Sequence, residues 1–246
     1  MTIRIEAATG THIGDKPDQQ DRLVILSSER HRGVLLAVVA DGMGGLSGGA
    51  MAAEQVISTA TQLFESYAPS SEPAEALLRS IVEEAHVAIK LSRFTSEQQP
   101  HSTIVALLLQ GEHADWAHSG DSRLYHFRGP RLASQTVDHS YVEQLYREGK
   151  ITSDERLTHR QRNLLVSCLG AKSEPRVDFG RAASVQPGDA FLLCSDGLWA
   201  YFSDEELGKV LAALPPRPAA EKLVAAARVR ARGSGDNLSL IVVKIA

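Results

Sequence analysis

The sequence predicts an α+β fold in which an antiparallel sheet or sandwich carries helices on its outside. Short apolar strands follow one another through tight joins, and helical segments interrupt them in pairs. The regular alternation of strand and helix that a doubly wound parallel sheet requires is absent. A chain of 246 residues, 43% of them hydrophobic, can bury one large core or two small ones.

The N-terminal part of the chain begins with three expected strands. Residues 3–9 alternate apolar and polar side chains, which is typical of a half-buried strand. Residues 22–28 and 33–40 form two more, and the last of these is apolar enough to be buried on both faces. A helical period then predicts a helix over residues 50–64, and Pro73 opens a second helix.

The rest of the chain returns to strands, at 103–110, 113–119, 122–128 and 131–137. The joins Gly111-Glu112 and Gly120-Asp121 are short, which favours antiparallel neighbours. Helical, polar sequence over 140–162 is followed by strands at 177–184 and 189–196. Ser203 and Glu206 have capping-box spacing at the start of a helix that the proline-rich segment 215–218 ends. A helix over 219–232 and a final strand over 237–245 complete one domain, 1–246, with residues 140–165 as a surface lobe.

Composition excludes several classes of function. The net charge is -4, and acids and bases are mixed along the chain, which disfavours nucleic-acid binding. The N-terminus has no apolar signal region, and no apolar run is long enough to span a bilayer. Cys168 and Cys194 lie in apolar runs and are expected to be free, buried thiols. We therefore expect a soluble, cytoplasmic protein that does not bind membranes.

The stretch LLAVVADGMGGLSGGA, residues 35–50, places glycines between a strand and a helix, where phosphate-binding loops occur. A Walker loop needs a lysine followed by serine or threonine, and this stretch contains no lysine. A dinucleotide fingerprint fits Gly42, Gly44 and the acid Glu65, but Ser47 occupies the third glycine position. A dinucleotide-binding enzyme therefore remains as a rival hypothesis.

Aspartates beside glycines recur at the ends of the expected strands. They are Asp41, Asp121, Asp196 and Asp236, and Asp21 precedes another strand. One such pair is usually a turn, but an aspartate at the edge of a core is costly to desolvate unless it is neutralised. Few basic residues lie beside these positions in the sequence. Oxygen ligands without nearby cysteine favour Mg²⁺ or Mn²⁺, so the pattern predicts one shared metal site.

The motifs DGMGG, GDSRLY, DHS, FLLCSDGLW and GDNLSLIVV occur in the order and approximate spacing of the PPM family. These are the metal-dependent serine/threonine protein phosphatases, also called type 2C, and the resemblance covers about residues 14–243. Residues 147–170 also resemble the helical flap of bacterial members. The resemblance implies a central antiparallel β-sandwich flanked by helix pairs, in α-β-β-α layers.

The resemblance also implies a role for each matching residue. Asp41 bridges two metal ions, and the carbonyl of Gly42 ligates one of them. Asp196 and Asp236 complete the ligands of the second ion, and Asp121 together with Asp196 holds a third, more weakly bound ion. Asp21 orients metal-bound water. The implied cofactors are thus two Mn²⁺ or Mg²⁺ ions, with a third bound more weakly.

Three positions depart from the family pattern. Lys16 stands where the family has an arginine that grips phosphate, so the charge is kept but the bidentate fork is lost. Met43 stands where animal members have a histidine proposed as general acid, so the proton donor is not identified. His101 begins a strand that usually starts Gly-Thr-Thr, which we interpret as a local packing difference.

The expected function is hydrolysis of phosphoserine and phosphothreonine on proteins, opposing a serine/threonine kinase, by a monomeric enzyme. A cysteine nucleophile is disfavoured, because neither cysteine has a phosphate loop of the Cys-x5-Arg kind. The alternative is a catalytically weak pseudophosphatase that binds a phosphorylated partner. A phosphatase acting on an anti-sigma-factor antagonist is a third hypothesis, although that branch usually carries sensor domains.

Overall fold

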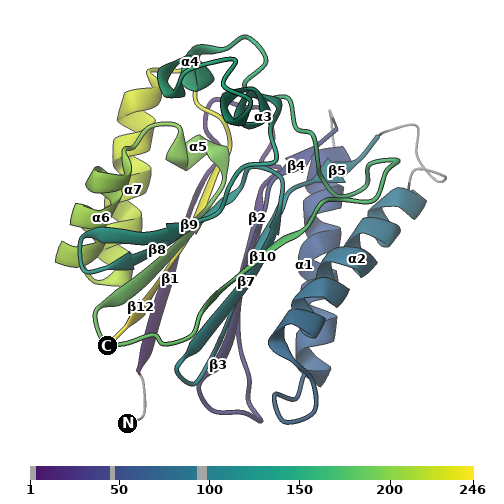
Figure 1. Ribbon diagram of the computed structural model, residues 1–246, viewed down its shortest axis with the longest axis vertical. Coiled ribbons are helices and arrows are strands. Elements are labelled where there is room, and N and C mark those ends of the chain that lie inside the picture. Colours follow the sequence, from purple (N-terminus) through teal and green to yellow (C-terminus); the bar gives the residue numbers. More distant parts are fainter. Residues whose placement is uncertain (1–3, 45–47, 93–98) are drawn as a thin grey trace.

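Two antiparallel five-stranded sheets face each other in the centre of the molecule, with a pair of long helices outside each sheet (Figure 1). The computed structural model describes residues 4–44, 48–92 and 99–246. This architecture confirms the predicted α+β sandwich in α-β-β-α layers. Ile3, where the first strand was expected to begin, and Ser47 lie outside the described residues.

The first sheet contains, in spatial order, β1 (Ile5–His12), β12 (Leu238–Ile245), β11 (Asp189–Cys194), β8 (Arg123–Arg128) and β9 (Arg131–Gln135). The second contains β10 (Asp178–Ala182), β7 (His113–Ser119), β6 (Ile104–Gln110), β3 (Val34–Ala40) and β2 (Arg22–Ser27). A two-stranded sheet pairs β4 (Gly42–Met43) with β5 (His101–Ser102).

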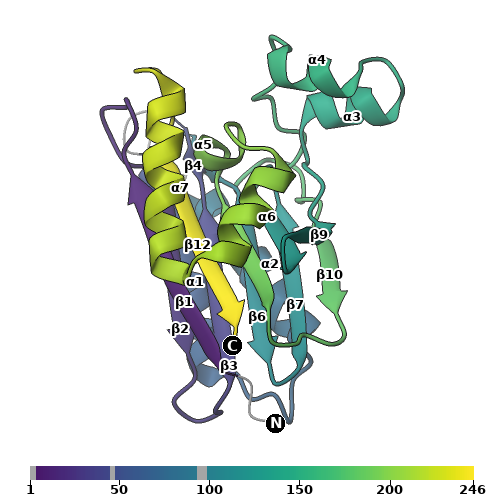
Figure 2. The ribbon, with the colours of Figure 1, turned by 90° about the vertical axis from the view of Figure 1, so that its left-hand side faces the viewer.

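The core has three layers because each central strand presents apolar side chains on both faces. Along β3, Leu35, Ala37 and Val39 pack toward the first sheet, against residues such as Phe191 and Ile241. The alternate residues of β3 pack against α1 (Gly48–Ser66) and α2 (Ala74–Ser92). The outer face of the first sheet is covered by α6 (Asp204–Ala213) and α7 (Pro216–Ala231) (Figure 2). The prediction that the 33–40 strand is buried on both faces is confirmed.

The lobe at residues 140–165 lies at one end of the sandwich and carries two short helices, α3 (Tyr141–Arg147) and α4 (Ser153–Thr158) (Figure 2). The helical expectation for this segment is therefore correct in type, but a turn divides it in two. Ser140 and Thr152 cap the two helices by accepting a hydrogen bond from a backbone N–H of the first turn. A further short helix, α5 (Asp196–Trp199), follows β11.

Two expectations about connections are wrong. The Gly120-Asp121 join does not make a hairpin, because β7 and β8 belong to different sheets. Gly120 has a φ of +109° and turns the chain across from one sheet to the other. The segment 215–218 ends α6 but also begins α7 at Pro216, because proline is tolerated in the first turn of a helix.

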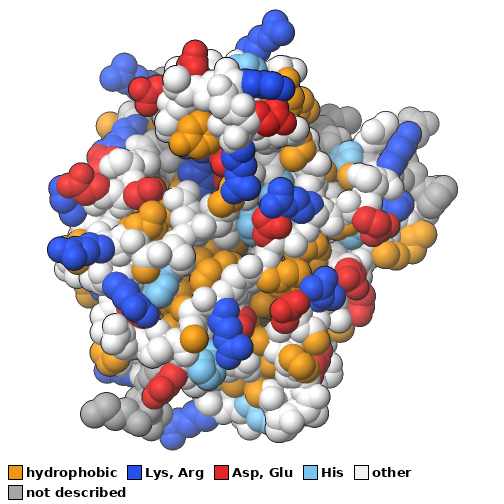
Figure 3. Space-filling model, viewed as in Figure 1, with side chains coloured by type: hydrophobic (Ala, Val, Ile, Leu, Met, Phe, Trp, Pro, Cys, Tyr) orange, Lys and Arg blue, Asp and Glu red, His pale blue; other side chains and the backbone are white. Residues whose placement is uncertain are grey.

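The remaining general expectations can be compared directly with the structure. Neither Cys168 nor Cys194 forms a disulfide with another described residue; Cys194 is buried and Cys168 partly buried. Acidic and basic side chains are interspersed on the face shown in Figure 3, as the mixed charge pattern predicts. Among the described residues, no helix is long and apolar enough to cross a membrane.

Candidate metal centre

The aspartates from the strand ends gather at the end of the sandwich that carries the lobe. Asp41 follows β3, Asp121 joins β7 to β8, Asp196 begins α5, and Asp236 precedes β12. These four line one cavity of about 380 Å³, which we call the aspartate pocket. Its other lining residues include Lys16, Gly42, Met43, Asn163 and Asn237.

Asp21, the fifth predicted residue, lies buried behind this pocket rather than in its lining. Its Oδ2 accepts a hydrogen bond of 2.7 Å from Ser195 Oγ. Its Oδ1 is buried and has no hydrogen-bond partner among the described residues. An unpartnered carboxylate oxygen at this depth is costly, so the site fits a bound cation or water with which Asp21 could interact.

The electrostatics of these carboxyl groups indicate that the cluster is short of positive charge. Burial raises the pKa of Asp41 and of Asp196 well above the ordinary value, and neighbouring aspartates raise both further. Burial likewise raises the pKa of Asp121 to about 7 and that of Asp21 to about 6. Divalent cations would remove this mutual repulsion, so the residues present fit a hard metal ion.

Two contacts hold Asp41 and Gly42 against their neighbours. The backbone N–H of Asp41 donates to Thr103 Oγ1 at 3.0 Å, and the N–H of Thr103 donates to the carbonyl of Asp41 at 2.9 Å. A Cβ on Gly42 would lie 2.0 Å from the carbonyl oxygen of Gly49. Position 42 therefore requires glycine, because the chain passes directly against the start of α1 there.

Lys16 is the basic side chain in the lining of the aspartate pocket, and its ammonium is already engaged. Lys16 Nζ lies 2.8 Å from both carboxylate oxygens of Asp236. The hydrogen bond to Asp236 raises the pKa of Lys16 above its usual value. Met43, which also lines the pocket, pairs directly with His101 across β4 and β5.

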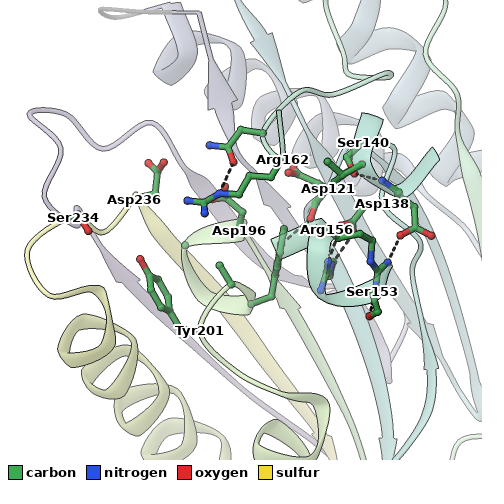
Figure 4. Close-up of a pocket in the computed structure, with 17 residues that line it drawn as sticks. Asp121, Asp138, Ser140, Ser153, Arg156, Arg162, Asp196, Tyr201, Ser234 and Asp236 are labelled. Atoms are coloured by element: carbon green, nitrogen blue, oxygen red, sulfur yellow. Dashed lines mark hydrogen bonds and ion pairs between the residues drawn. The ribbon is translucent and has the colours of Figure 1, made fainter. Parts of the chain in front are cut away.

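A second cavity, of about 270 Å³, adjoins the first between the lobe and α5 (Figure 4). It shares Asp121, Asp196 and Asp236 with the aspartate pocket, and we call it the lobe pocket. Arg156 and Arg162 from the lobe also line it. Three more residues of this lining, for which the sequence predicted no role, are Arg123, Asp138 and Trp199. They stand inside the quoted motifs, but their contacts depend on how distant strands meet.

The histidines His118 and His139 form a separate group with Asp178, and neither lines the aspartate pocket. Among the described residues, this group brings three possible ligand atoms within 4.8 Å of one another, whereas no three of the aspartates do. The two rings stack, with centroids 4.6 Å apart and planes inclined by 22°. Because an imidazole lone pair lies in the ring plane, two nearly parallel rings do not point at one ion.

Hydrogen bonds account for one nitrogen of each histidine ring, whereas His118 Nδ1 and His139 Nε2 are buried without a hydrogen-bond partner among the described residues. His118 Nε2 is 2.9 Å from the carbonyl of Val137, and His139 Nε2 is 3.2 Å from Asp178 Oδ2. The backbone N–H of Gly120 donates to His139 Nδ1 at 3.3 Å. Burial lowers the pKa of both histidines, that of His139 to about 4. The two imidazoles are thus neutral, and His139 supports the Gly120-Asp121 turn through its Nδ1, whereas Asp178 is a carboxylate paired with Arg176.

Comparison with known proteins gives consistent matches along the chain. The family model described as protein phosphatase 2C matches residues 10–229. The serine/threonine protein phosphatase PstP of Mycobacterium tuberculosis is 32% identical over 222 residues, which are 87% of this chain and 41% of PstP. The serine/threonine phosphatase stp of Listeria monocytogenes is 30% identical over 85% of this chain and 84% of that protein. The chain therefore spans less than half of the mycobacterial relative and most of the listerial one.

The fold also matches solved structures. One is the catalytic domain of a serine threonine protein phosphatase PstP in complex with two manganese ions, with a TM-score of 0.80 and 27% sequence identity. The similarity covers 100% of both chains. It extends through the strands and loops that carry the aspartates.

Proposed function

Because this chain belongs to the protein phosphatase 2C family of metal-dependent serine/threonine protein phosphatases, we propose that the aspartate pocket is its active site. There it removes phosphate from phosphoserine and phosphothreonine in proteins. The observation that carries the proposal is that four aspartates line one cavity, namely Asp41, Asp121, Asp196 and Asp236. They repel one another, as the raised pKa of Asp41 indicates, and so lack compensating positive charge. Such a cavity suits divalent cations and the phosphate group that they bind.

The ligands are proposed residue by residue. Asp41, whose pKa is raised by all four other aspartates, would bridge two ions, Mn²⁺ or Mg²⁺, with the Gly42 carbonyl on one of them. Asp196 and Asp236 would complete the ligands of the other ion, and Asp121 with Asp196 would hold a third, more weakly bound ion. When bound, such ions lower the pKa of a water and stabilise charge on phosphoryl oxygens. Asp21, buried behind the pocket with one free oxygen, would orient the attacking water.

Lys16 would contribute positive charge at the rim of the pocket. Its contact with Asp236 holds the ammonium beside the proposed ligands, where an incoming phosphate oxygen can share it. Met43 has no proton to give, so the leaving serine or threonine oxygen would take its proton from water or from another group.

Phosphorylated proteins are the proposed substrates, and a serine/threonine kinase would supply them. The lobe pocket continues the active site toward α3 and α4, so it would accommodate residues beside the phosphorylated one. We propose that residues 1–246 act as one phosphatase domain in which the lobe at 140–165 serves as a flap.

The test is release of phosphate from a phosphoserine peptide with Mn²⁺, compared between the wild type and Asp196→Asn. The matched control is Asp204→Asn, an exposed aspartate at the start of α6. The proposal expects activity in the wild type and the control, and its loss in Asp196→Asn. An Asp196→Asn variant as active as the wild type would refute the assigned site. A wild type that binds the phosphopeptide without turnover would identify the pseudophosphatase alternative instead.

A further inference from the structure

We propose that Trp199, held in place by Arg123, is a positioning residue that fixes the Asp121 segment for its metal ion. This inference rests on the proposed function, in which Asp121 and Asp196 share the third, weaker ion. It assigns a task to three residues that line the lobe pocket beside the proposed ligands, namely Arg123, Asp138 and Trp199.

The first step is a hydrogen bond from the indole of Trp199 to the backbone of Asp121. Trp199 Nε1–H donates to the carbonyl oxygen of Asp121 at 2.9 Å. Helix α5 begins with Asp196 and ends with Trp199. The first residue of this short helix, Asp196, is therefore a proposed ligand. Its last residue, Trp199, is hydrogen-bonded to the segment that carries Asp121, another proposed ligand. The distance between Asp121 and Asp196 depends on this contact.

The indole ring of Trp199 is itself held in place by Arg123. The guanidinium carbon of Arg123 lies 3.6 Å from the centroid of the Trp199 ring, which is a close cation–π stack. Arg123 is fixed from its edges: Nε and Nη2 donate to the two oxygens of Asp138 at 2.8 and 2.7 Å. Arg123 Nη1 also donates to the hydroxyl of Tyr125, a fully buried residue, at 3.1 Å. A planar guanidinium held at three points orients the ring stacked on it.

The other side of the Asp121 turn is held by contacts that do not involve Trp199. The backbone N–H of His139 donates to the carbonyl of Gly120 at 2.8 Å. A Cβ on Gly120 would lie 2.6 Å from Thr103, so the turn also has no room to shift that way. Trp199 thus completes a set of contacts around a turn that carries a buried carboxylate, and its removal frees one side.

The experiment uses the fact that the chain has two tryptophans, Trp116 and Trp199. In a Trp116→Phe background, emission comes from Trp199 alone, and Mn²⁺ binding is followed by this emission and by calorimetry. Trp199→Phe, made in the natural sequence and followed by calorimetry, keeps a ring for Arg123 to stack on but has no N–H to donate. We expect the weakest Mn²⁺ affinity to fall roughly fivefold, as one lost hydrogen bond implies, while the tighter affinities stay unchanged.

Two further variants make the outcome decisive. Arg123→Lys keeps the charge but loses the fork to Asp138, so it should weaken the same ion even if Trp199→Phe does not fold. Asp121→Asn in the Trp116→Phe background should abolish the Trp199 response to the weakest ion. Unchanged weakest affinity in both Trp199→Phe and Arg123→Lys would overturn this inference alone. Absence of any Mn²⁺ binding by the wild-type protein in calorimetry would overturn the proposed function and this inference with it.

Discussion

Lys16 lines the aspartate pocket at the position where the family resemblance led us to expect an arginine. An ammonium offers a point charge where a guanidinium would offer two parallel hydrogen bonds to a phosphate. In the structure that ammonium contacts both oxygens of Asp236. It therefore also tempers the charge of a proposed metal ligand, and its two roles can be separated by substitution.

We expect Lys16→Ala to lower kcat/KM for a small aryl phosphate about tenfold, since a hydrogen bond to a charged group contributes on the order of 1.5 kcal/mol. Lys16→Arg should match or exceed the wild type, because the fork is restored. Steady-state kinetics at saturating Mn²⁺ measure both. Equal kcat/KM in the alanine variant would show that Lys16 only neutralises Asp236.

Gly42 is constrained by space rather than by backbone torsion. A Cβ there would overlap the carbonyl of Gly49, so Gly42→Ala must push the Asp41 segment away from α1. We expect a large fall in thermal stability and in Mn²⁺ binding, measured by melting curves and calorimetry. Gly33→Ala is the control: its φ is +80°, but a Cβ there would have no atom of the other described residues within 4 Å beyond its chain neighbours. It should therefore cost only about 1 kcal/mol and leave activity intact.

At the scale of single elements, α6 shows how local sequence can determine local structure. Ser203 accepts from the N–H of Glu206, and the Glu206 side chain accepts from the N–H of Ser203. The capping box predicted from spacing is thus confirmed. We expect Ser203→Ala to cost about 1 kcal/mol of unfolding free energy without altering kcat, because α6 covers the first sheet away from the aspartate pocket. Chemical denaturation measures the loss; a changed kcat would contradict it.

The burial of other helices and strands was also predictable where the local sequence alone determines it. The apolar run of β3 and the helical stripe of α2 specify burial by composition and period alone. The Gly120-Asp121 join was not predictable, because a short glycine turn serves equally for a hairpin and for a crossing between sheets. Only the distant partners of these strands, β10 beside β7 and β11 beside β8, decide between the two.

The residues of the candidate site also differ in how far they could be predicted from the local sequence. Aspartates at strand ends were found because each breaks an apolar run, and that cost is visible locally. The support offered by Arg123 and Trp199 was not found, because an arginine after a turn and a tryptophan in an apolar segment have ordinary local explanations. Their contact joins the start of β8 to the end of α5, and no periodicity encodes it.

At the scale of the whole molecule, repulsion among the clustered aspartates affects both the proposed active site and the stability of the fold. The two sheets meet where the aspartates cluster, so their repulsion acts on the packing of the sandwich itself. A carboxyl group whose folded pKa exceeds its unfolded value stabilises the fold below the unfolded pKa. That stability is lost as pH rises through the folded pKa. Asp21, at about 6, and Asp121, at about 7, both have this sign.

We therefore expect the metal-free protein to lose thermal stability as pH rises from 6.5 to 8.5. The buried histidines act in the opposite sense, since the lowered pKa of His139 adds stability as pH rises through the ordinary histidine value of 6.5. Their contribution becomes constant about one pH unit above that value. Melting curves in chelator should show the decline, and saturating Mn²⁺ at pH 8.5 should reverse it, because bound cations favour the ionised carboxylates. Asp121→Asn, which cannot ionise, should be more stable than the wild type in chelator at pH 8.5 and gain less from Mn²⁺. A metal-free wild type equally stable at both pH values would mean that the carboxylates are neutralised by the protein itself, and the need for metal at this cluster would fall away.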